Sequence, residues 1–153
     1  NFKSAYMPFL SKRFARDMAK CIQENYFMQF DMITYTPLSK KSLRKRDYNQ
    51  AYLLAKEISK ILDIPLADLL IKVRKTKEQK SLNSRERKTN VYGAFDLKDK
   101  DIVINKRILL IDDVKTTGST LNECAKMLNI YGAQSVWAAT LAVAVPKEKG
   151  DKK

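Results

Sequence analysis

Hydrophobic residues in the first half of the chain recur at helical spacing, then in a short strand-like run, then at helical spacing again. From Asn1 to Gln29 apolar residues alternate with basic ones at a spacing that predicts an amphipathic helix. Asp31 to Thr36 is a β-branched run that Pro37 ends, so we predict a strand. Leu38 to Asn49 is strongly basic without an apolar period, which indicates a loop before a second helix. The residues predicted to face the core are Phe14, Met18, Cys21 and Ile22, and then Ala51, Leu54, Ala55, Ile58 and Leu62.

The second half of the chain alternates between strand and helix patterns around one polar stretch. Leu69–Val73 and Val91–Leu97 are predicted strands, and Arg74–Asn90 between them lacks an apolar period and indicates a long loop. Ile108 to Ile111 is an unbroken apolar run, as expected of a parallel strand covered on both faces. The remaining predicted elements are a helix carrying Leu121, Cys124, Ala125 and Leu128, a turn at Tyr131-Gly132, a strand from Ser135 to Val145 and a charged tail from Pro146 to Lys153.

This order of elements predicts an α/β fold with a mainly parallel central sheet flanked by helices. The 153 residues suit a single domain, which we expect at residues 1–145, with 146–153 as its tail. The chain has no apolar run long enough to cross a bilayer and no secretory signal pattern, so we expect a cytoplasmic protein without membrane insertion.

Composition adds a strong positive charge and removes one class of metal site. Thirty basic residues against 17 acidic ones give a net charge of +13, which fits a polyanionic partner but equally fits general solvation. There is no histidine and no Cys-x-x-Cys pair, so we expect no zinc site in this chain. Cys21 and Cys124 both lie on apolar helical patterns and are predicted to be buried free thiols.

Candidate chemistry is concentrated just after the Ile108–Ile111 strand. Asp112 and Asp113 fall at its predicted end, where open parallel sheets bind ligands. A small, hydroxyl-rich loop follows and leads into a helix start, whose amides and dipole favour an anion. Two carboxylates beside a phosphate-binding loop suit a sugar phosphate. The candidate phosphate-binding residues are Lys115, Thr116, Thr117, Gly118, Ser119 and Thr120.

Three other interpretations compete for this segment. An apolar strand ending in two acids also occurs in nucleotidases of the Walker type, but these need a Gly-x-x-x-x-Gly-Lys-Ser/Thr loop that the chain lacks. A phosphoacceptor domain ends a strand in Asp but does not continue with Thr-Thr-Gly-Ser-Thr. The third alternative is an ordinary strand-loop-helix with solvated acids.

The segment Ile108–Thr120 resembles the signature of type I phosphoribosyltransferases. The resemblance implies that fold, with phosphoribosyl pyrophosphate as the ligand and a flexible lid over it. It implies that Asp112 and Asp113 hold the ribose hydroxyls as the catalytic pair and that Thr116–Thr120 wraps the 5′-phosphate. Lys115 either contacts that phosphate or points to water. Mg²⁺ is expected to be held through the ligand rather than by direct protein ligands.

Further motifs resemble the narrower ComF family, the competence-associated branch of these proteins, over about Asp31–Leu141. They are Thr36-Pro37-Leu38-Ser39, Arg46-Asp47-Tyr48-Asn49-Gln50, Arg74-Lys75-Thr76 with Gln79, and Arg85 and Asn90 before Gly93-Ala94-Phe95. Asp47 stands where the family usually has glycine, and Thr36 where it usually has valine, which reads as a small change. Members often carry an N-terminal zinc module, which is absent from this chain.

The resemblance implies roles for the remaining motif residues. Pro37, Leu38, Ser39 and Lys40 form the expected pyrophosphate loop, and Arg74, Lys75, Gln79, Arg85 and Arg87 the expected lid, although a solvated charged loop is the alternative. Arg46, Asn49, Gln50 and Asn90 are further candidates, and Asn49 equally suits a helix cap. Residues 1–30 are the expected hood. Thr116 stands where 6-oxopurine enzymes carry an acid, which argues against that specificity.

Two functions follow from these features. The first is a Mg²⁺-dependent phosphoribosyltransferase, a pentosyl-transferring enzyme, with a role in DNA uptake. The second is a non-catalytic competence protein that binds single-stranded DNA or a nucleotide on the same fold. Its basic surface would comprise Lys40, Lys41, Arg44, Lys45, Arg46, Lys75, Lys77 and Lys80. Proteins of the competence machinery are expected partners in either case.

Overall fold

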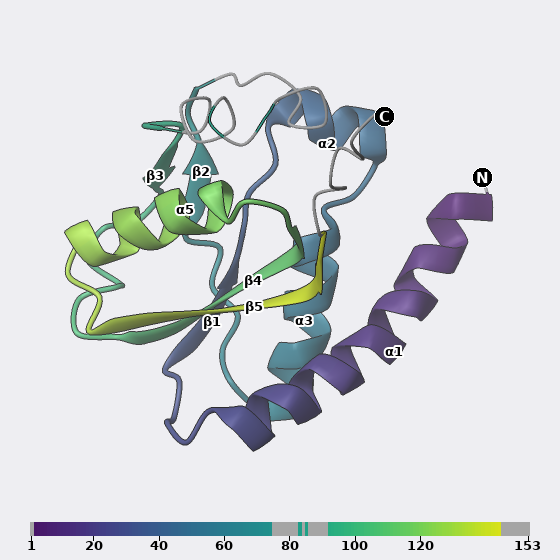
Figure 1. Ribbon diagram of the computed structural model, residues 1–153, viewed down its shortest axis with the longest axis horizontal. Helices are drawn as coiled ribbons and strands as arrows, with labels where there is room; N and C mark the ends of the chain where they lie inside the picture. The colour runs from purple at the N-terminus through teal and green to yellow at the C-terminus, as the bar shows by residue number, and fades with distance from the viewer. Residues whose placement is uncertain (1, 75–82, 84, 86–91, 145–153) are drawn as a thin grey trace, which may run out of the picture.

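The computed structural model of the protein describes residues 2–74, 83, 85 and 92–144 (Figure 1). Helices and strands alternate along the chain, as the hydrophobic pattern predicts. In chain order the elements are α1 (Phe2–Asn25), β1 (Met32–Tyr35), α2 (Lys40–Arg46), α3 (Gln50–Leu62), β2 (Leu70–Lys72), β3 (Phe95–Leu97), β4 (Arg107–Lys115), α5 (Ser119–Ile130) and β5 (Ser135–Val143).

A parallel sheet in the order β1-β4-β5 forms the centre of the molecule. The run Ile108–Ile111 lies in β4, between the two other strands and covered on both faces, and its four residues have no exposed surface. At the start of the sheet, Arg107 donates from its side chain to both carboxylate oxygens of Asp31, at 3.1 Å each. This pair holds the beginnings of β1 and β4 together, and it lowers the pKa of Asp31 to about 2.

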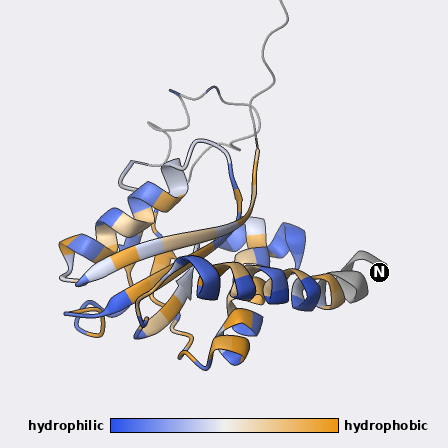
Figure 2. Cartoon of the chain, turned by 60° about the horizontal axis from the view of Figure 1, so that its bottom comes forward, coloured by the Kyte–Doolittle hydropathy of each residue, from blue (hydrophilic) through white to orange (hydrophobic). Residues whose placement is uncertain are grey.

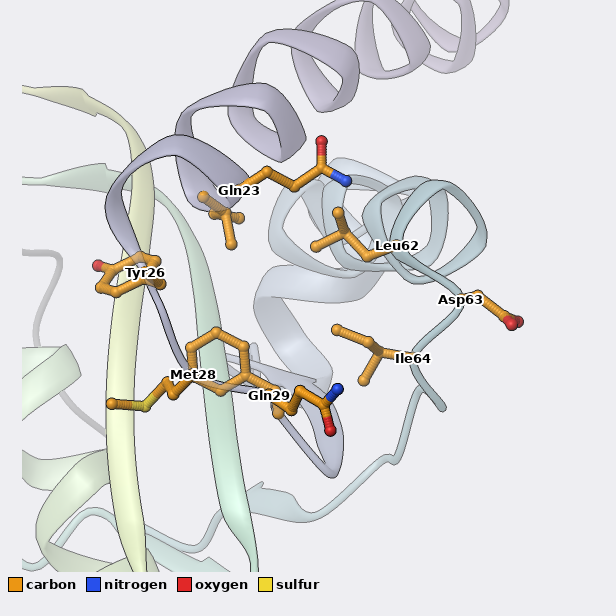
Figure 3. A pocket seen from close by; sticks show the side chains of 9 residues that line it. Gln23, Tyr26, Met28, Gln29, Leu62, Asp63 and Ile64 are labelled. Carbon is orange, nitrogen blue, oxygen red and sulfur yellow. The ribbon is translucent and has the colours of Figure 1, made fainter.

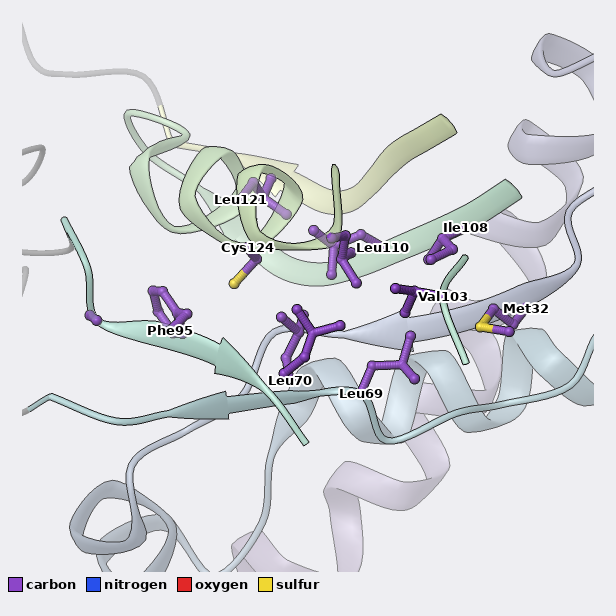
Figure 4. Packing of buried hydrophobic residues seen from close by; sticks show 12 residues of the cluster. Met32, Leu69, Leu70, Phe95, Val103, Ile108, Leu110, Leu121 and Cys124 are labelled. Atoms are coloured by element: carbon purple, nitrogen blue, oxygen red, sulfur yellow. The ribbon is translucent and has the colours of Figure 1, made fainter. Parts of the chain in front are cut away.

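Each face of the sheet carries its own layer. Alternate residues of the strands point to opposite faces, so Ile33 and Ile111 pack against α1 and α3, whereas Ile108 and Leu110 pack against α5 and the antiparallel β2–β3 hairpin. Figure 4 shows this second cluster, with Cys124 of α5 above Leu70 of β2. The hydropathy colouring in Figure 2 shows that apolar and polar positions alternate along the helices, as expected of helices that cover a sheet with one face. The result is an α/β/α sandwich.

Most of the predicted elements are present. The N-terminal helix, the Asp31–Thr36 strand, the helices around Leu54 and Leu128 and the final strand are all confirmed. The exposed fraction of Phe95 is 4%, which places this aromatic ring in the core. The predicted thiol burial is right for Cys124 and wrong for Cys21, which lies on the exposed side of α1.

The predicted loop Leu38–Asn49 is wrong, because Lys40–Arg46 forms the helix α2. Ser39 caps it by accepting a hydrogen bond from the amide of Ser42 at 3.1 Å, and Asp47 ends it with a left-handed backbone at φ 63°. Aspartate tolerates this conformation better than most residues, so the turn survives without glycine. The helix buries none of its residues, which explains the missing apolar period.

Strand β4 also differs from its predicted bounds. It continues through Asp112 and Asp113 to Lys115, because β5 pairs with it in parallel as far as Lys115↔Val143. The paired acids therefore lie within the strand rather than at its end. The predicted strand Val91–Leu97 is shorter, since β3 begins at Phe95 after a turn at Tyr92 and Gly93. The tail 146–153 and most of Arg74–Asn90 lie outside the described residues.

Candidate functional site at the carboxyl end of the sheet

Asp112 is a buried carboxyl group at the carboxyl end of the sheet, with an exposed fraction of 8%. Its Oδ1 accepts two hydrogen bonds, from the hydroxyl of Thr36 at 2.7 Å and from the amide of Asp113 at 2.9 Å. Burial, together with the neighbouring carboxyl of Asp113, raises the pKa of Asp112 to about 7, although the hydrogen bonds from the Thr36 hydroxyl and the Asp113 amide oppose the shift. Such a carboxyl changes its charge near neutral pH.

Asp113 is half-buried and follows Asp112 in β4. Its Oδ1 accepts a hydrogen bond from the amide of Val114 at 2.8 Å. The two carboxyl groups predicted from the sequence are thus adjacent, and they differ in burial and in hydrogen-bond partners.

The hydroxyl-rich loop follows β4 directly. Because the strand extends to Lys115, the loop consists only of Thr116–Gly118. Gly118 has φ 79° and precedes the first residue of α5. A β-carbon on Gly118 would lie 3.2 Å from Cε of Lys115, so the lysine side chain passes close over this backbone. The hydroxyls of Thr117 and Ser119 lie 2.6 Å apart, and the amide of Ser119 donates to Thr117 at 3.3 Å.

Together these segments line a small pocket of about 40 Å³, which has room for a few water molecules or a phosphate group. The first-turn amides of α5 lie at this end of the helix, where the helix dipole favours an anion. Five of the six predicted phosphate-loop residues line the pocket, the exception being Thr117. Of the two acids, Asp112 lines it. The lining residues are Asp112, Val114, Lys115, Thr116, Gly118, Ser119, Thr120 and Leu121.

The predicted pyrophosphate loop adjoins the acids through Thr36. Pro37, Leu38 and Ser39 are half-buried and lead from β1 into α2, whose first residue Lys40 is exposed. Because Ser39 caps α2, its hydroxyl already has a structural role.

The next motif holds this loop in place. Asn49 donates from Nδ2 to the carbonyl of Thr36 at 3.0 Å and caps α3 by accepting from the amide of Tyr52 at 3.3 Å. The cap interpretation of Asn49 is therefore confirmed. Arg46 lies on the surface, with its guanidinium 3.4 Å from the amide oxygen of Gln50.

The predicted lid is only partly described. Lys75, Gln79, Arg87 and Asn90 lie outside the described residues, as do Lys77 and Lys80 of the predicted basic surface. Arg74 is exposed and donates to the carbonyl of Tyr92 at 2.6 Å, across the base of the β2–β3 hairpin. Arg85 is exposed. A role for these side chains at the ligand stays a prediction.

Sequence reasoning missed the contribution of Thr36. The sequence signal was an alternation in which Thr34 and Thr36 share one face of β1 with Met32, the face on which Asp112 lies. Cys124 of α5 also lies near Asp112, and burial together with that carboxyl raises the pKa of its thiol. Lys72 of β2 approaches the same region, and burial lowers the pKa of its amine.

A second, larger pocket of about 430 Å³ lies at the opposite end of the sheet (Figure 3). Leu62 and Ile64 face Tyr26 and Met28 across it, between the ends of α1 and α3. Its lining combines apolar side chains with the polar Gln23, Gln29 and Asp63, and it lies at the amino end of β1. Because parallel sheets bind ligands at the carboxyl ends of their strands, we place the candidate site at Asp112. Among the described residues, no helix is long and apolar enough to cross a membrane.

Comparison with known proteins agrees with this geometry. Residues 48–153 match the family model of the phosphoribosyl transferase domain. The chain is 41% identical over 100 residues to competence protein F of Haemophilus influenzae, covering 64% of this chain and 44% of that protein. It is 35% identical over 107 residues to the DNA utilization protein YhgH of Escherichia coli, covering 69% and 46%. The chain therefore spans about half the length of these relatives.

Solved structures show the same fold. The adenine phosphoribosyltransferase of Thermoanaerobacter pseudethanolicus superposes with a TM-score of 0.56 over 86% of this chain and 66% of that one, at 17% identity. The parallel sheet, the acids on β4 and the glycine loop before α5 fit this type I phosphoribosyltransferase fold. The chain belongs to the phosphoribosyl transferase domain family, in its ComF competence-protein branch.

Proposed function

We propose that this domain binds phosphoribosyl pyrophosphate, or a related ribose 5-phosphate ligand, at Asp112–Thr120. The observation that supports this best is the contact between a buried, hydrogen-bonded acid and a phosphate-sized pocket. The pocket begins at Asp112 and ends at the first turn of α5, so one ligand can reach the acids and the helix terminus together.

In this proposal each part of the site binds a different part of the ligand. The carboxyl groups of Asp112 and Asp113 accept hydrogen bonds from the ribose hydroxyls, because a carboxylate offers several acceptor positions. The loop Thr116–Gly118 and the amides of α5 bind the 5′-phosphate. The loop Pro37–Lys40 adjoins Asp112 through Thr36 and binds the pyrophosphate.

The described residues suit a magnesium ion carried by the ligand. They contain no group of three or more His, Cys, Asp or Glu side chains that could hold a metal by themselves. Mg²⁺ in proteins commonly keeps waters and substrate phosphate oxygens as ligands beside one or two carboxylates. When bound, the ion would neutralise negative charge on the departing pyrophosphate.

Calorimetry with phosphoribosyl pyrophosphate and Mg²⁺ tests the binding proposal. Replacing both acids, Asp112→Asn with Asp113→Asn, should weaken binding at least tenfold, because hydrogen bonds to charged groups contribute roughly 1.5–3 kcal/mol each. The matched control is Asp99→Asn with Asp101→Asn, which removes the same charge from an exposed turn. Equal affinity of the two double variants would contradict the proposal.

Turnover separates the two candidate classes. An enzyme should release pyrophosphate from phosphoribosyl pyrophosphate when the acceptor base is supplied, and a panel of bases would identify that acceptor. Thr116 offers no carboxylate for the proton of a 6-oxopurine, so we expect hypoxanthine and guanine to fail. Binding without release by any base would favour a non-catalytic role in competence.

The second candidate function is binding of single-stranded DNA in DNA uptake. The specific observation is α2, which carries five basic residues and no acidic one, buries none of its residues and begins at Lys40, the last residue of the proposed pyrophosphate loop. One relative is named a DNA utilization protein, and another a competence protein. A polyanion on this helix would lie beside the ligand site, so both functions can belong to one protein.

A further inference from the structure

The hydrogen bond from Thr36 to Asp112 joins two separate halves of the candidate site. Thr36 follows β1 and Asp112 lies on β4, and both side chains are buried, with exposed fractions of 6% and 8%. The 2.7 Å contact and the bond from the Asp113 amide both end on Oδ1. Thr36 is itself held by a bond from its amide to the Ile111 carbonyl at 3.0 Å.

Asn49 adds a further constraint, because it donates to the Thr36 carbonyl. The hydroxyl that reaches Asp112 is thus fixed from the strand on one side and from the start of α3 on the other. A donor fixed in this way favours the ionised form of the acid, because a hydrogen bond to a charged carboxylate is stronger than one to a neutral carboxyl group. No other side-chain hydroxyl of the described residues donates to this carboxyl.

We propose that Thr36 is a positioning residue for ligand binding, whose hydroxyl fixes Oδ1 of Asp112 and favours the charged form of that carboxyl. Oδ2 then remains to accept a hydroxyl of the ligand. The role of Thr36 in ligand binding rests on the proposed function. Its effect on the charge of Asp112 does not depend on any ligand. The presence of threonine instead of the family's usual valine at position 36 is therefore not a small change in this chain.

Among the residues that the structure describes, the ionisable groups around Asp112 are the carboxyl of Asp113 on β4, the thiol of Cys124 on α5 and the amine of Lys115 at the shared pocket. Lys72 of β2 acts on Cys124 and so lies one step further away. These groups are unchanged when Thr36 is replaced by valine, which has nearly the same shape. A change in the titration of Asp112 can then be assigned to the lost hydroxyl.

Thr34 provides a matched control on the same strand and the same face. Its side chain is fully buried, and its Oγ1 has no hydrogen-bond partner within the described part of the chain. Thr34→Val removes a buried hydroxyl just as Thr36→Val does, but it leaves Asp112 untouched. We expect Thr34→Val to leave the protein as stable as before or slightly more stable, because an unpaired buried polar atom is unfavourable.

The first experiment needs no ligand. The side-chain carboxyl carbon of Asp112 is followed by NMR across pH 4 to 9 in the unaltered protein, assigned with Asp112→Asn, and in both valine variants. Thr36→Val should move the midpoint to higher pH, whereas Thr34→Val and Thr36→Ser should keep it in place. Equal midpoints for Thr36→Val and Thr34→Val would overturn the proposal, whatever the protein binds.

The second experiment measures affinity for ribose 5-phosphate by calorimetry at pH 6.5 and pH 8.5. Each unit by which the midpoint rises should weaken binding by up to about tenfold at the lower pH and little at the higher pH. Thr36→Ser should restore the profile of the unaltered protein, which a merely structural role would not require. If the unaltered protein binds at neither pH, the proposed function fails while the NMR result for Thr36 stands.

Discussion

Gly118 is the residue at which backbone geometry and ligand site coincide. Gly118→Ala should destabilise the protein by about 1–2 kcal/mol, because a β-carbon is disfavoured at φ 79°. It should also weaken ligand binding, because the new atom would lie 3.2 Å from Cε of Lys115 and displace that side chain. Urea unfolding and calorimetry with ribose 5-phosphate measure the two effects separately.

Gly93 is the matched control for this substitution. It also has a positive φ, 66°, but a β-carbon there meets nothing within 4 Å. Gly93→Ala should therefore lose similar stability and keep its affinity for the ligand. If both alanine variants lost affinity equally, the effect would belong to general strain and not to the loop beside Lys115.

The raised pKa of Asp112 predicts a pH-dependent stability. Its folded pKa of about 7 exceeds the model-peptide value of 3.8, so the folded state binds the proton more tightly than the unfolded state. The contribution of this group is fully present below about pH 4 and is lost as pH rises from 4 through 7. Asp112→Asn cannot ionise, so its stability relative to the unaltered protein should increase over this range, by at least ~1 kcal/mol.

Urea unfolding at pH 5, 6, 7 and 8 measures that difference in the absence of ligand. Asp99→Asn serves as the control, because Asp99 is exposed. A stability difference between Asp112→Asn and the unaltered protein that did not change with pH would mean that the carboxyl is already ionised throughout. Any effect of Asp112→Asn on stability would then have a cause other than the ionisation of this carboxyl.

Sequence reasoning at this scale identified which residues carry the chemistry but not how they touch. The acids and the loop were recognisable because their residue types and order suit a sugar phosphate. The contact of Thr36 with Asp112 joins residues 76 positions apart and depends on the pairing of Tyr35 with Ile111. Because that register depends on the tertiary fold, the sequence alone does not show that the hydroxyl of Thr36 has a partner.

At the scale of elements, Asn49 connects the start of α3 to the end of β1. Its Oδ1 caps the helix, and its Nδ2 donates to Thr36. Asn49→Ala loses both bonds and should cost about 1–2 kcal/mol, of which the cap is typically ~1. Asn49→Asp keeps an oxygen for the cap and loses only the donor, so it should cost less.

Urea unfolding of these two variants separates the cap from the connection to Thr36. The titration of Asp112 adds a second measurement, since both variants release the Thr36 carbonyl while only one removes the cap. We expect both to loosen Thr36 and to raise the pKa of Asp112 slightly. If Asn49→Asp were as damaging to stability as Asn49→Ala, the cap would not be the larger contribution.

The elements that the sequence predicted are those with a buried face. The helices α1, α3 and α5 each place apolar residues at helical spacing, such as Ala51, Leu54 and Ile58 of α3. Helix α2 gave no such signal because it buries nothing, and it depends on the cap at Ser39 and the turn at Asp47. The extension of β4 to Lys115 was equally hidden, because pairing with β5 and not local composition produces it.

At the scale of the whole molecule, the candidate ligand site forms where the two halves of the chain meet. The first half supplies β1, α2 and α3, and the second supplies β4, α5 and the small pocket. Neither half contains both the acids and the loop that adjoins them through Thr36. Ligand binding should therefore depend on the pairing of β1 with β4.

The net charge of +13 leads to a prediction about single-stranded DNA. Phosphate contacts release counterions, so affinity should fall with salt by about 0.7 log units per log unit of salt for each phosphate contacted. Replacing Lys40, Lys41, Arg44 and Lys45 by Gln keeps good helix formers and removes four charges from α2. This variant should bind more weakly and show a smaller salt slope in fluorescence anisotropy with a long single strand.

The matched control removes four charges from exposed positions of α1, at Lys12, Arg13, Arg16 and Lys20. If α2 is the DNA surface, the α1 variant should keep most of the affinity and salt slope, because only contacted phosphates release their ions. Equal losses in the two variants would mean that net charge alone attracts the strand. Absence of binding at low salt would contradict a DNA-binding role for this domain, and the positive charge would then serve solvation.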